Sequence, residues 1–139
     1  MPSSTAVAII GGGMTGLSAA KTLKEAGIDS LVLERDSVLG GRMSTRDLSG
    51  AIYDDGAQFF TVKDERFGPL VEEMKSVGVI TDWFHSEMIQ GGANNPDGFP
   101  RYCGANGMRS ILDHMCGQGL SVLMEATVTG FEPTGKRYK

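Results

Sequence analysis

The sequence predicts an α/β fold with a parallel sheet, and three features of its first 34 residues carry this prediction. A short apolar run, residues 7–10, is followed at once by glycines. Residues 14–26 then repeat apolar side chains at helical spacing, and a second apolar run over residues 30–34 ends in an acid. A strand, a helix and a strand within about 30 residues form a βαβ unit, whose two strands lie parallel and adjacent.

Each element of this unit has its own signal. Residues 7–10 are continuously apolar, which predicts a strand buried on both faces of the sheet. Gly27 follows the helical segment and is a favourable C-terminal stop. The apolar face of the helix comprises Leu17, Ala20, Leu23 and Ala26.

The later segments follow a less regular pattern. Residues 36–60, with Gly40, Gly41 and Gly56 as breakers, are predicted to be rich in loops, and residues 90–100 are predicted to be a surface loop. Apolar spacing predicts helices over residues 67–77 and 108–116, and strands over residues 79–85, 120–124 and 126–131.

Composition bounds the class of protein. The 139 residues are 40% hydrophobic and 22% charged with a net charge of −4, which argues against a disordered tail, a coiled coil or a nucleic-acid-binding surface. Neither a membrane-spanning run nor a secretory signal is recognisable. Cys103 and Cys116 lack CxxC spacing and are expected to be free thiols. We therefore expect a cytoplasmic protein.

The glycines between the first strand and the helix match the pattern GxGxxG. Gly11 permits the tight turn, Gly13 allows a pyrophosphate to approach the backbone, and Gly16 allows the helix to pack close to the sheet. The free amides of the first helical turn and the helix dipole favour an anion there. This context predicts a Rossmann-like site for a dinucleotide such as FAD or NAD(P).

Two further positions bear on the choice of dinucleotide. Glu34 ends the second strand, where a carboxylate accepts hydrogen bonds from the ribose hydroxyls of adenosine and repels a 2′-phosphate. Its neighbour Arg35 is also a candidate cofactor-binding residue and weakens this argument against NADP. Gly41 and Arg42 follow, and free amides with a planar guanidinium suit a diphosphate. A solvated arginine in an ordinary turn is the alternative.

Taken together, these motifs resemble the N-terminal FAD-binding part of the flavin-containing amine oxidases, and within that family the renalase group. The resemblance runs in order through Gly11–Gly16, Glu34 and residues 40–45, 55–61, 102–108 and 120–131. The first three segments point to an FAD-binding flavoenzyme, and residues 55–61 point to the renalase group. The sequence departs from that group at Asn106, where proline is usual.

The resemblance implies a role for each matching position. The amides of Met14 and Thr15 would bind the FAD pyrophosphate, and Gly41 and Arg42 would contact the phosphates or the ribityl chain. Val128 would pack at the adenine end. The residues expected near the isoalloxazine ring are Ala57, Gln58 and Phe59.

The resemblance also implies an organisation that the chain covers only in part. We expect one FAD-binding Rossmann-like domain over residues 1–139, with the start of a substrate-domain insertion around residues 60–105. Family members are more than twice as long, so a further C-terminal half or a completing partner is expected. The implied substrate is a small molecule, either a reduced nitrogen compound or an aberrantly reduced nicotinamide dinucleotide, with oxygen as acceptor.

Catalytic residues are not evident from the sequence. His85 and His114 show no metal-binding spacing and are interpreted as structural, and no metal is expected. Asp54 and Asp55 are neighbours that would point apart, so neither is assigned as a general base. A catalytically silent dinucleotide-binding module and a fragment of an NAD-dependent pyridine-nucleotide reductase remain the alternatives to an FAD-dependent oxidoreductase.

Overall fold

The structure is a computed structural model that describes residues 4–85, 98–135 and 137–138. The chain divides into two compact units. Unit 1 comprises residues 1–39 and 115–139, and unit 2 comprises residues 40–114. Each unit is described by itself.

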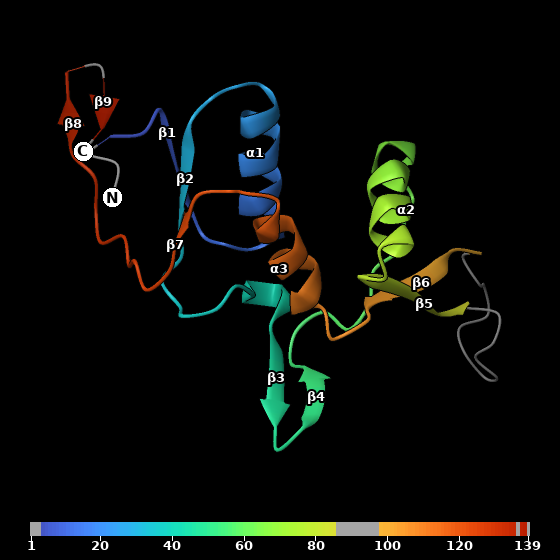
Figure 1. The fold of residues 1–139 in the computed structure, drawn as a ribbon. Coiled ribbons are helices and arrows are strands. Elements are labelled where there is room, and N and C mark those ends of the chain that lie inside the picture. Colours follow the sequence, from blue (N-terminus) through green and yellow to red (C-terminus); the bar gives the residue numbers. More distant parts are fainter. Residues whose placement is uncertain (1–3, 86–97, 136, 139) are drawn as a thin grey trace. The chain divides into compact units, whose positions relative to one another are not determined.

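Unit 1 contains the predicted βαβ arrangement. Strands β1 (Val7–Ile10) and β2 (Ser30–Leu33) are parallel neighbours, and helix α1 (Met14–Glu25) connects them (Figure 1). A third parallel strand, β7 (Val122–Leu123), pairs with the other edge of β2, which gives the order β1-β2-β7. A short antiparallel pair, β8 (Pro133–Thr134) and β9 (Arg137–Tyr138), follows. The α/β fold class with a parallel sheet is confirmed.

Of two predictions about burial in unit 1, one is wrong and one is confirmed in part. The prediction that β1 is buried on both faces is wrong, because Ile10 is 68% exposed and Ala8 is also exposed. In the described residues β1 pairs only with β2, so it forms an edge of this sheet. The apolar face of α1 is confirmed at Leu17 and Ala20, which are buried, whereas Ala26 is exposed.

Unit 2 is built from two antiparallel hairpins and the helices that follow or precede them. The first hairpin pairs β3 (Thr45–Leu48) with β4 (Ala51–Asp54), after the short 3-10 turn η1 (Gly41–Met43). The second pairs β5 (Ile80–His85) with β6 (Pro100–Gly104), after η2 (Glu65–Phe67) and α2 (Gly68–Ser76). Figure 1 shows both hairpins and α2 in green to orange.

Helix α3 (Arg109–Gly117) begins in unit 2 and ends in unit 1. The predicted helical periodicity over residues 108–116 is confirmed, because its four apolar positions are all buried. These are Met108, Ile111, Leu112 and Met115. The helix predicted over residues 67–77 corresponds to α2, in which Val71 and Met74 are buried.

Several predicted segments differ from the structure. Residues 36–60 are rich in loops as predicted, but they also contain η1, β3 and β4, which were not predicted. Residues 126–131 form no strand, and the strand predicted over 120–124 is limited to β7. The predicted loop over residues 90–100 lies mostly outside the described residues. None of the helices among the described residues is long and apolar enough to cross a bilayer.

Candidate dinucleotide-binding site

The glycine turn of unit 1 requires glycine for geometric reasons. Gly11 has φ +101°, a backbone conformation that side chains with a Cβ rarely adopt. A Cβ on Gly16 would lie 2.0 Å from the carbonyl oxygen of Gly11, so α1 could not approach the end of β1 so closely. The Gly11 amide donates to the carbonyl of Leu33 over 2.9 Å, which ties the turn to β2.

The start of α1 offers unpaired backbone amides. Gly13 is the N-cap, its conformation is extended, and no side chain caps the helix. The first turn contains no acidic residue that would compensate the positive end of the helix dipole. The first-turn amides, including those of Met14 and Thr15, have no intrahelical acceptor. This end of the helix is therefore chemically suited to an anion.

Glu34 lies against the glycine turn. Its side chain is buried, and Oε2 accepts a hydrogen bond of 2.6 Å from the Gly12 amide. Oε1 accepts one of 3.0 Å from the Asp36 amide. Each carboxylate oxygen still has acceptor capacity, but the structure shows its present role as holding the turn. Its contact with a ribose stays a prediction.

Gly12 is a residue of this turn that the sequence pattern left unassigned. A Cβ at Gly12 would lie 2.6 Å from Cδ2 of Leu39 and 3.1 Å from Oε2 of Glu34. Leu39 is 2% exposed and has little room to move aside. Three adjacent glycines were the available signal, since GxGxxG by itself requires only two of them.

Arg35 and Val128 are less closely tied to the turn. The Arg35 side chain is exposed, and its guanidinium lies 3.6 Å from the Asp36 carboxylate. Val128 is half-buried and follows β7 in the same unit. The segment before it runs beside β2, because the amide of Ala126 donates to the carbonyl of Glu34 over 2.8 Å.

In unit 2 the structure brings two predicted segments together. The amide of Ala57 donates to the carbonyl of Arg42 over 2.8 Å. A Cβ on Gly56 would lie 2.3 Å from the same carbonyl oxygen, so the two backbones are in direct contact. Gly41 has φ +58° and begins the 3-10 turn, and the Arg42 side chain is exposed. The segment predicted to contact the ribityl chain and the segment predicted to lie near the ring are thus in direct contact within unit 2.

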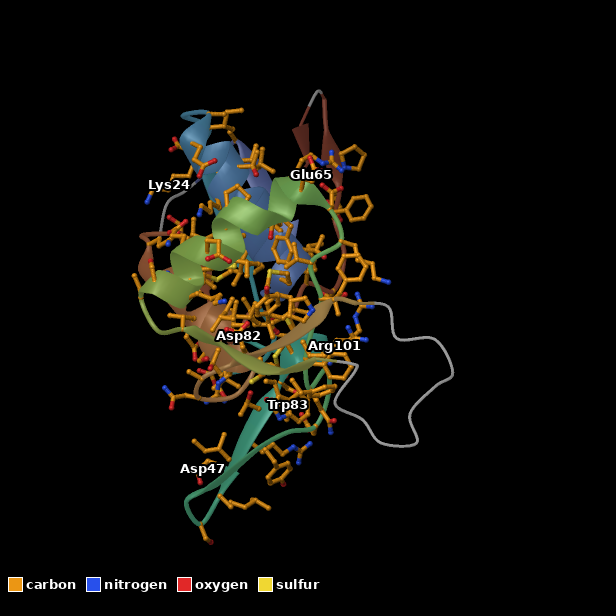
Figure 2. All side chains as sticks on the ribbon, turned by 90° about the vertical axis from the view of Figure 1, so that its right-hand side faces the viewer. Lys24, Asp47, Glu65, Asp82, Trp83 and Arg101 are labelled. Carbon is orange, nitrogen blue, oxygen red and sulfur yellow. The ribbon has the colours of Figure 1, made fainter. Side chains whose placement is uncertain are left out.

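Phe59 belongs to an exposed aromatic cluster. Its ring centroid lies 5.8 Å from that of Trp83 and 5.9 Å from that of Phe84. The Arg101 guanidinium lies 5.6 Å from the centre of the Phe59 ring. Figure 2 labels Trp83 and Arg101 near each other on the β5–β6 hairpin. Gln58, next to Phe59, is exposed.

Three polar side chains, those of Ser44, Asp55 and Arg46, form a cluster next in sequence to the Arg42–Ala57 contact. The Ser44 hydroxyl donates to Oδ1 of Asp55, and Nε of Arg46 donates to Oδ2. These two interactions, that of Ser44 first, lower the pKa of the Asp55 carboxyl, and the carboxylate raises the pKa of Arg46. We call this group the Ser44–Asp55–Arg46 cluster.

The neighbouring carboxylate, Asp54, points to a different place, as expected for adjacent residues of a strand. Its Oδ1 accepts from the Thr45 hydroxyl and, over 2.8 Å, from the amide of Met108. The Thr45 oxygen in turn accepts from the amide of Arg109 over 2.9 Å. Asp54 and Thr45 therefore satisfy amides at the start of α3, and they form no acid–base couple with Asp55.

The remaining candidates bear little on the site. Cys103 and Cys116 are not joined by a disulfide bond, and burial together with the Asp54 charge raises the pKa of Cys103. His114 is half-buried in the last turn of α3. The His85 side chain lies outside what the structure describes. Within the described residues, no three His, Cys, Asp or Glu side chains are grouped so as to hold a metal ion.

Comparison with known proteins supports the nature of the domain. Residues 9–74 match the family of NAD(P)-binding Rossmann-like domains. The chain is 35% identical over 68 residues to chloroplastic/mitochondrial protoporphyrinogen oxidase 2 of Arabidopsis thaliana, covering 49% of this chain and 13% of that one. It is 42% identical over 66 residues to polyamine oxidase 7 of Oryza sativa subsp. japonica, covering 46% of this chain and 14% of that one.

One solved structure extends the likeness in fold to nearly the whole chain. The structure of BexE, studied for oxidation during BE-7585A biosynthesis, matches with a TM-score of 0.61 at 21% identity. The match covers 95% of this chain and 26% of that one. At this identity it shows the fold alone.

These findings confirm the Rossmann-like fold class and a dinucleotide-binding domain. The two relatives are oxidases by name, which agrees with the predicted oxidoreductase class, and the matched family is a dinucleotide-binding one, which agrees with a dinucleotide such as FAD as the predicted cofactor. The chain spans only 13% and 14% of the lengths of the two relatives named above. What those whole proteins do is therefore carried to this chain only as a proposal.

Proposed function

We propose that this chain is the FAD-binding part of an oxidoreductase related to the amine oxidases. The observation that carries the proposal is the start of α1, where Gly13 caps the helix without a side-chain bond and the first turn contains no acid. The amides of Met14 and Thr15 would bind the pyrophosphate of FAD there. The buried Glu34 carboxylate, bound to the Gly12 amide, keeps the turn in place and is the candidate for the ribose.

Residues of unit 2 are also proposed to contact FAD. Gly41 and Arg42 would contact the phosphates or ribityl chain, and Ala57, Gln58 and Phe59 would lie near the ring. The hydrogen bond between Ala57 and the Arg42 carbonyl keeps the two segments in register. Arg35 and Val128 remain candidates for the adenosine end.

In the proposed enzyme, the cofactor would supply the redox chemistry and the residues of this chain would bind and orient it. FAD, when bound, would accept a hydride from the substrate and pass two electrons to oxygen, which yields hydrogen peroxide. The chain's own residues would bind and orient the cofactor through amides, a carboxylate and a guanidinium. We assign no general base. The substrate we propose is a reduced nitrogen compound or an aberrantly reduced nicotinamide dinucleotide, by resemblance to the renalase group, in a cytoplasmic setting.

The helix N-terminus can be tested without removing the helix. Met14 is the first residue of α1, where proline is well tolerated because its missing N–H has no intrahelical acceptor. Gly13 is extended, with φ −86° and ψ −178°, which also suits a following proline. Met14→Pro therefore deletes one proposed pyrophosphate donor, while Met14→Ala truncates the same side chain and keeps the amide.

We expect Met14→Pro to weaken FAD binding about 10- to 100-fold relative to Met14→Ala, since a hydrogen bond to a charged group contributes about 1.5–3 kcal/mol. Flavin absorbance and fluorescence titrations give the dissociation constants, and circular dichroism checks that both variants keep their helices. Equal affinities for the two variants would count against an FAD site at this helix. Failure of the unaltered protein to bind FAD would remove the proposal.

A second candidate function is a catalytically silent dinucleotide-binding module. The features that support FAD binding, the uncapped start of α1 and the Glu34–Gly12 bond, concern binding and not turnover, so such a module would share them. Parallel titrations with FAD, NAD and NADP separate FAD binding from a site for NAD alone. If the FAD-loaded protein releases hydrogen peroxide on addition of a reduced nicotinamide isomer, the silent module is excluded. Bound FAD without any turnover of that donor or of simple amines favours it.

A further inference from the structure

The two unit 2 segments proposed to face FAD are not held by a regular sheet. Strand β3 begins at Thr45 and β4 ends at Asp54, so residues 41–44 and 55–59 extend beyond the hairpin. Between them the backbone supplies the bond from Ala57 to Arg42 and one of 3.3 Å from the Asp55 amide to the Ser44 carbonyl. The relative placement of residues 41–44 and 55–59 therefore also depends on the side-chain interactions between the two segments.

The Ser44–Asp55–Arg46 cluster is what joins them through side chains. The Asp55 carboxylate accepts from Ser44 with one oxygen and from Arg46 with the other. Its side chain is 27% exposed, while that of Arg46 is 64% exposed. The Asp55 carboxylate is thus bonded to two residues that lie shortly after Arg42 in the chain, and Asp55 directly precedes Gly56, where the two backbones are in contact.

The contact at Gly56 makes this placement stringent. A Cβ there would lie 2.3 Å from the carbonyl oxygen of Arg42 and 2.8 Å from its carbonyl carbon, both of which are backbone atoms. The two backbone segments, at Gly56 and at Arg42, therefore approach as closely as glycine permits. A small displacement of residues 55–57 would move Arg42 and Ala57 together or break the bond between them.

We propose that Asp55 is a positioning residue for the cofactor, which sets residues 41–42 and 57–59 in the arrangement that binds FAD. The inference rests on the proposed function, since it concerns how that same site is held. Asp55 itself points at Ser44 and Arg46 and is given no role in proton transfer. Its removal should alter how FAD is bound rather than whether the glycine turn of unit 1 forms.

The test uses the full chain and begins with FAD titration of the unaltered protein. Asp55→Asn keeps the size of the side chain and removes its charge and one acceptor, and Ser44→Ala removes one donor and serves if the first variant fails to fold. The matched control is Asp64→Asn. Asp64 also accepts from an arginine, Arg66, through both carboxylate oxygens and from a backbone amide, and Arg66 belongs to neither of the two segments.

We expect Asp55→Asn to raise the dissociation constant of FAD about tenfold, the equivalent of one charge-assisted hydrogen bond, and Asp64→Asn to change it less than about twofold. The visible spectrum of the bound flavin should also shift in Asp55→Asn and not in Asp64→Asn. Arg46→Gln should weaken binding in the same direction and add little in the Asp55→Asn background, because the two residues act as one unit.

The outcomes separate this inference from the proposed function. If the unaltered protein binds no FAD, both fall. If it binds FAD and Asp55→Asn binds it with the same affinity and spectrum, the positioning role is overturned while the proposed function stands. If Asp55→Asn and Asp64→Asn weaken binding equally, with equal losses in melting temperature and no spectral shift, Asp55 is only structural and the inference is again overturned.

Discussion

The buried carboxylate of Glu34 and the backbone amide of Gly12 form a hydrogen bond of 2.6 Å across the glycine turn. The bond joins the end of β2 to the turn that follows β1, 22 residues earlier in the chain. A carboxylate at this position is therefore required by the turn itself, before any ligand binds. This relationship leads directly to a measurable consequence for stability.

Replacement of Glu34 by glutamine should destabilise the protein. The two carboxylate oxygens accept from the backbone amides of Gly12 and Asp36. In a glutamine, the NH2 group would take the place of one of these oxygens, and one backbone N–H would then point at another hydrogen-bond donor. We expect Glu34→Gln to lower the free energy of unfolding by about 1–3 kcal/mol. Urea denaturation measures it, and the exposed Glu25→Gln, on the same unit, should change it by less than about 0.5 kcal/mol. A loss no larger than that of Glu25→Gln would contradict the argument.

Two glycine-to-alanine substitutions should have opposite signs. At Gly16 a Cβ would meet the backbone oxygen of Gly11 at 2.0 Å, and backbone cannot move aside cheaply. At Gly117, the last residue of α3, no atom lies within 4 Å, and its backbone φ is not positive. We expect Gly16→Ala to cost about 1–3 kcal/mol or more by overpacking, and Gly117→Ala to add about 0.5–1 kcal/mol of stability. Thermal unfolding followed by circular dichroism checks both, and the same sign for both would refute the geometry.

The βαβ unit could be predicted because its signals are local. Short apolar runs, a glycine with positive φ and an amphipathic face all lie within 34 residues, and each specifies its own element. The burial of β1 could not be predicted in the same way. An apolar run favours a buried strand, but burial depends on neighbouring strands, and β1 pairs on one side only in the described residues.

The β3–β4 hairpin was missed although its turn gave a signal. Ser49 and Gly50 have φ +57° and +87°, the two positive values of a two-residue hairpin turn, and serine–glycine is a known turn pair. The flanking strands are largely exposed on both faces, so no alternation of apolar and polar residues marked them. Conversely, residues 126–131 do alternate between apolar and polar side chains, which predicted a strand, but the structure has no strand there.

The candidate site shows the same limit. The motifs led to Arg42 and Ala57 separately, but the bond between their backbones depends on the register of a hairpin that was not predicted. Asp55 was considered only as half of an acidic pair, because its bonds to Ser44 and Arg46 arise from that register too. Sequence patterns identify the segments, and the folded hairpin decides which of their atoms meet.

Thr45 should stabilise the start of α3 through its hydroxyl. That oxygen accepts from the Arg109 amide and donates to Asp54, and the residue is 7% exposed. Thr45→Val keeps the shape and leaves these partners unsatisfied, so we expect a loss of about 1–2 kcal/mol. Thr45→Ser keeps the hydroxyl and loses only a methyl group, at a cost of about 1 kcal/mol or less. Urea unfolding of both variants tests the order, and a reversed order would show that packing of the methyl group matters more.

The contribution of Asp55 to stability should disappear in acid. The hydrogen bond from Ser44 and the Arg46 guanidinium hold the pKa of this carboxyl below its ordinary value of 3.8, so the folded state favours the charged form. A group with a depressed pKa in the folded state contributes stability that is complete above its unfolded pKa and is lost as the pH falls through the folded one. The difference in unfolding free energy between the unaltered protein and Asp55→Asn should thus be constant above about pH 5 and shrink below it. Urea denaturation at a series of pH values measures this difference, and a difference that grows on acidification would mean that the bonded form of Asp55 is the neutral one.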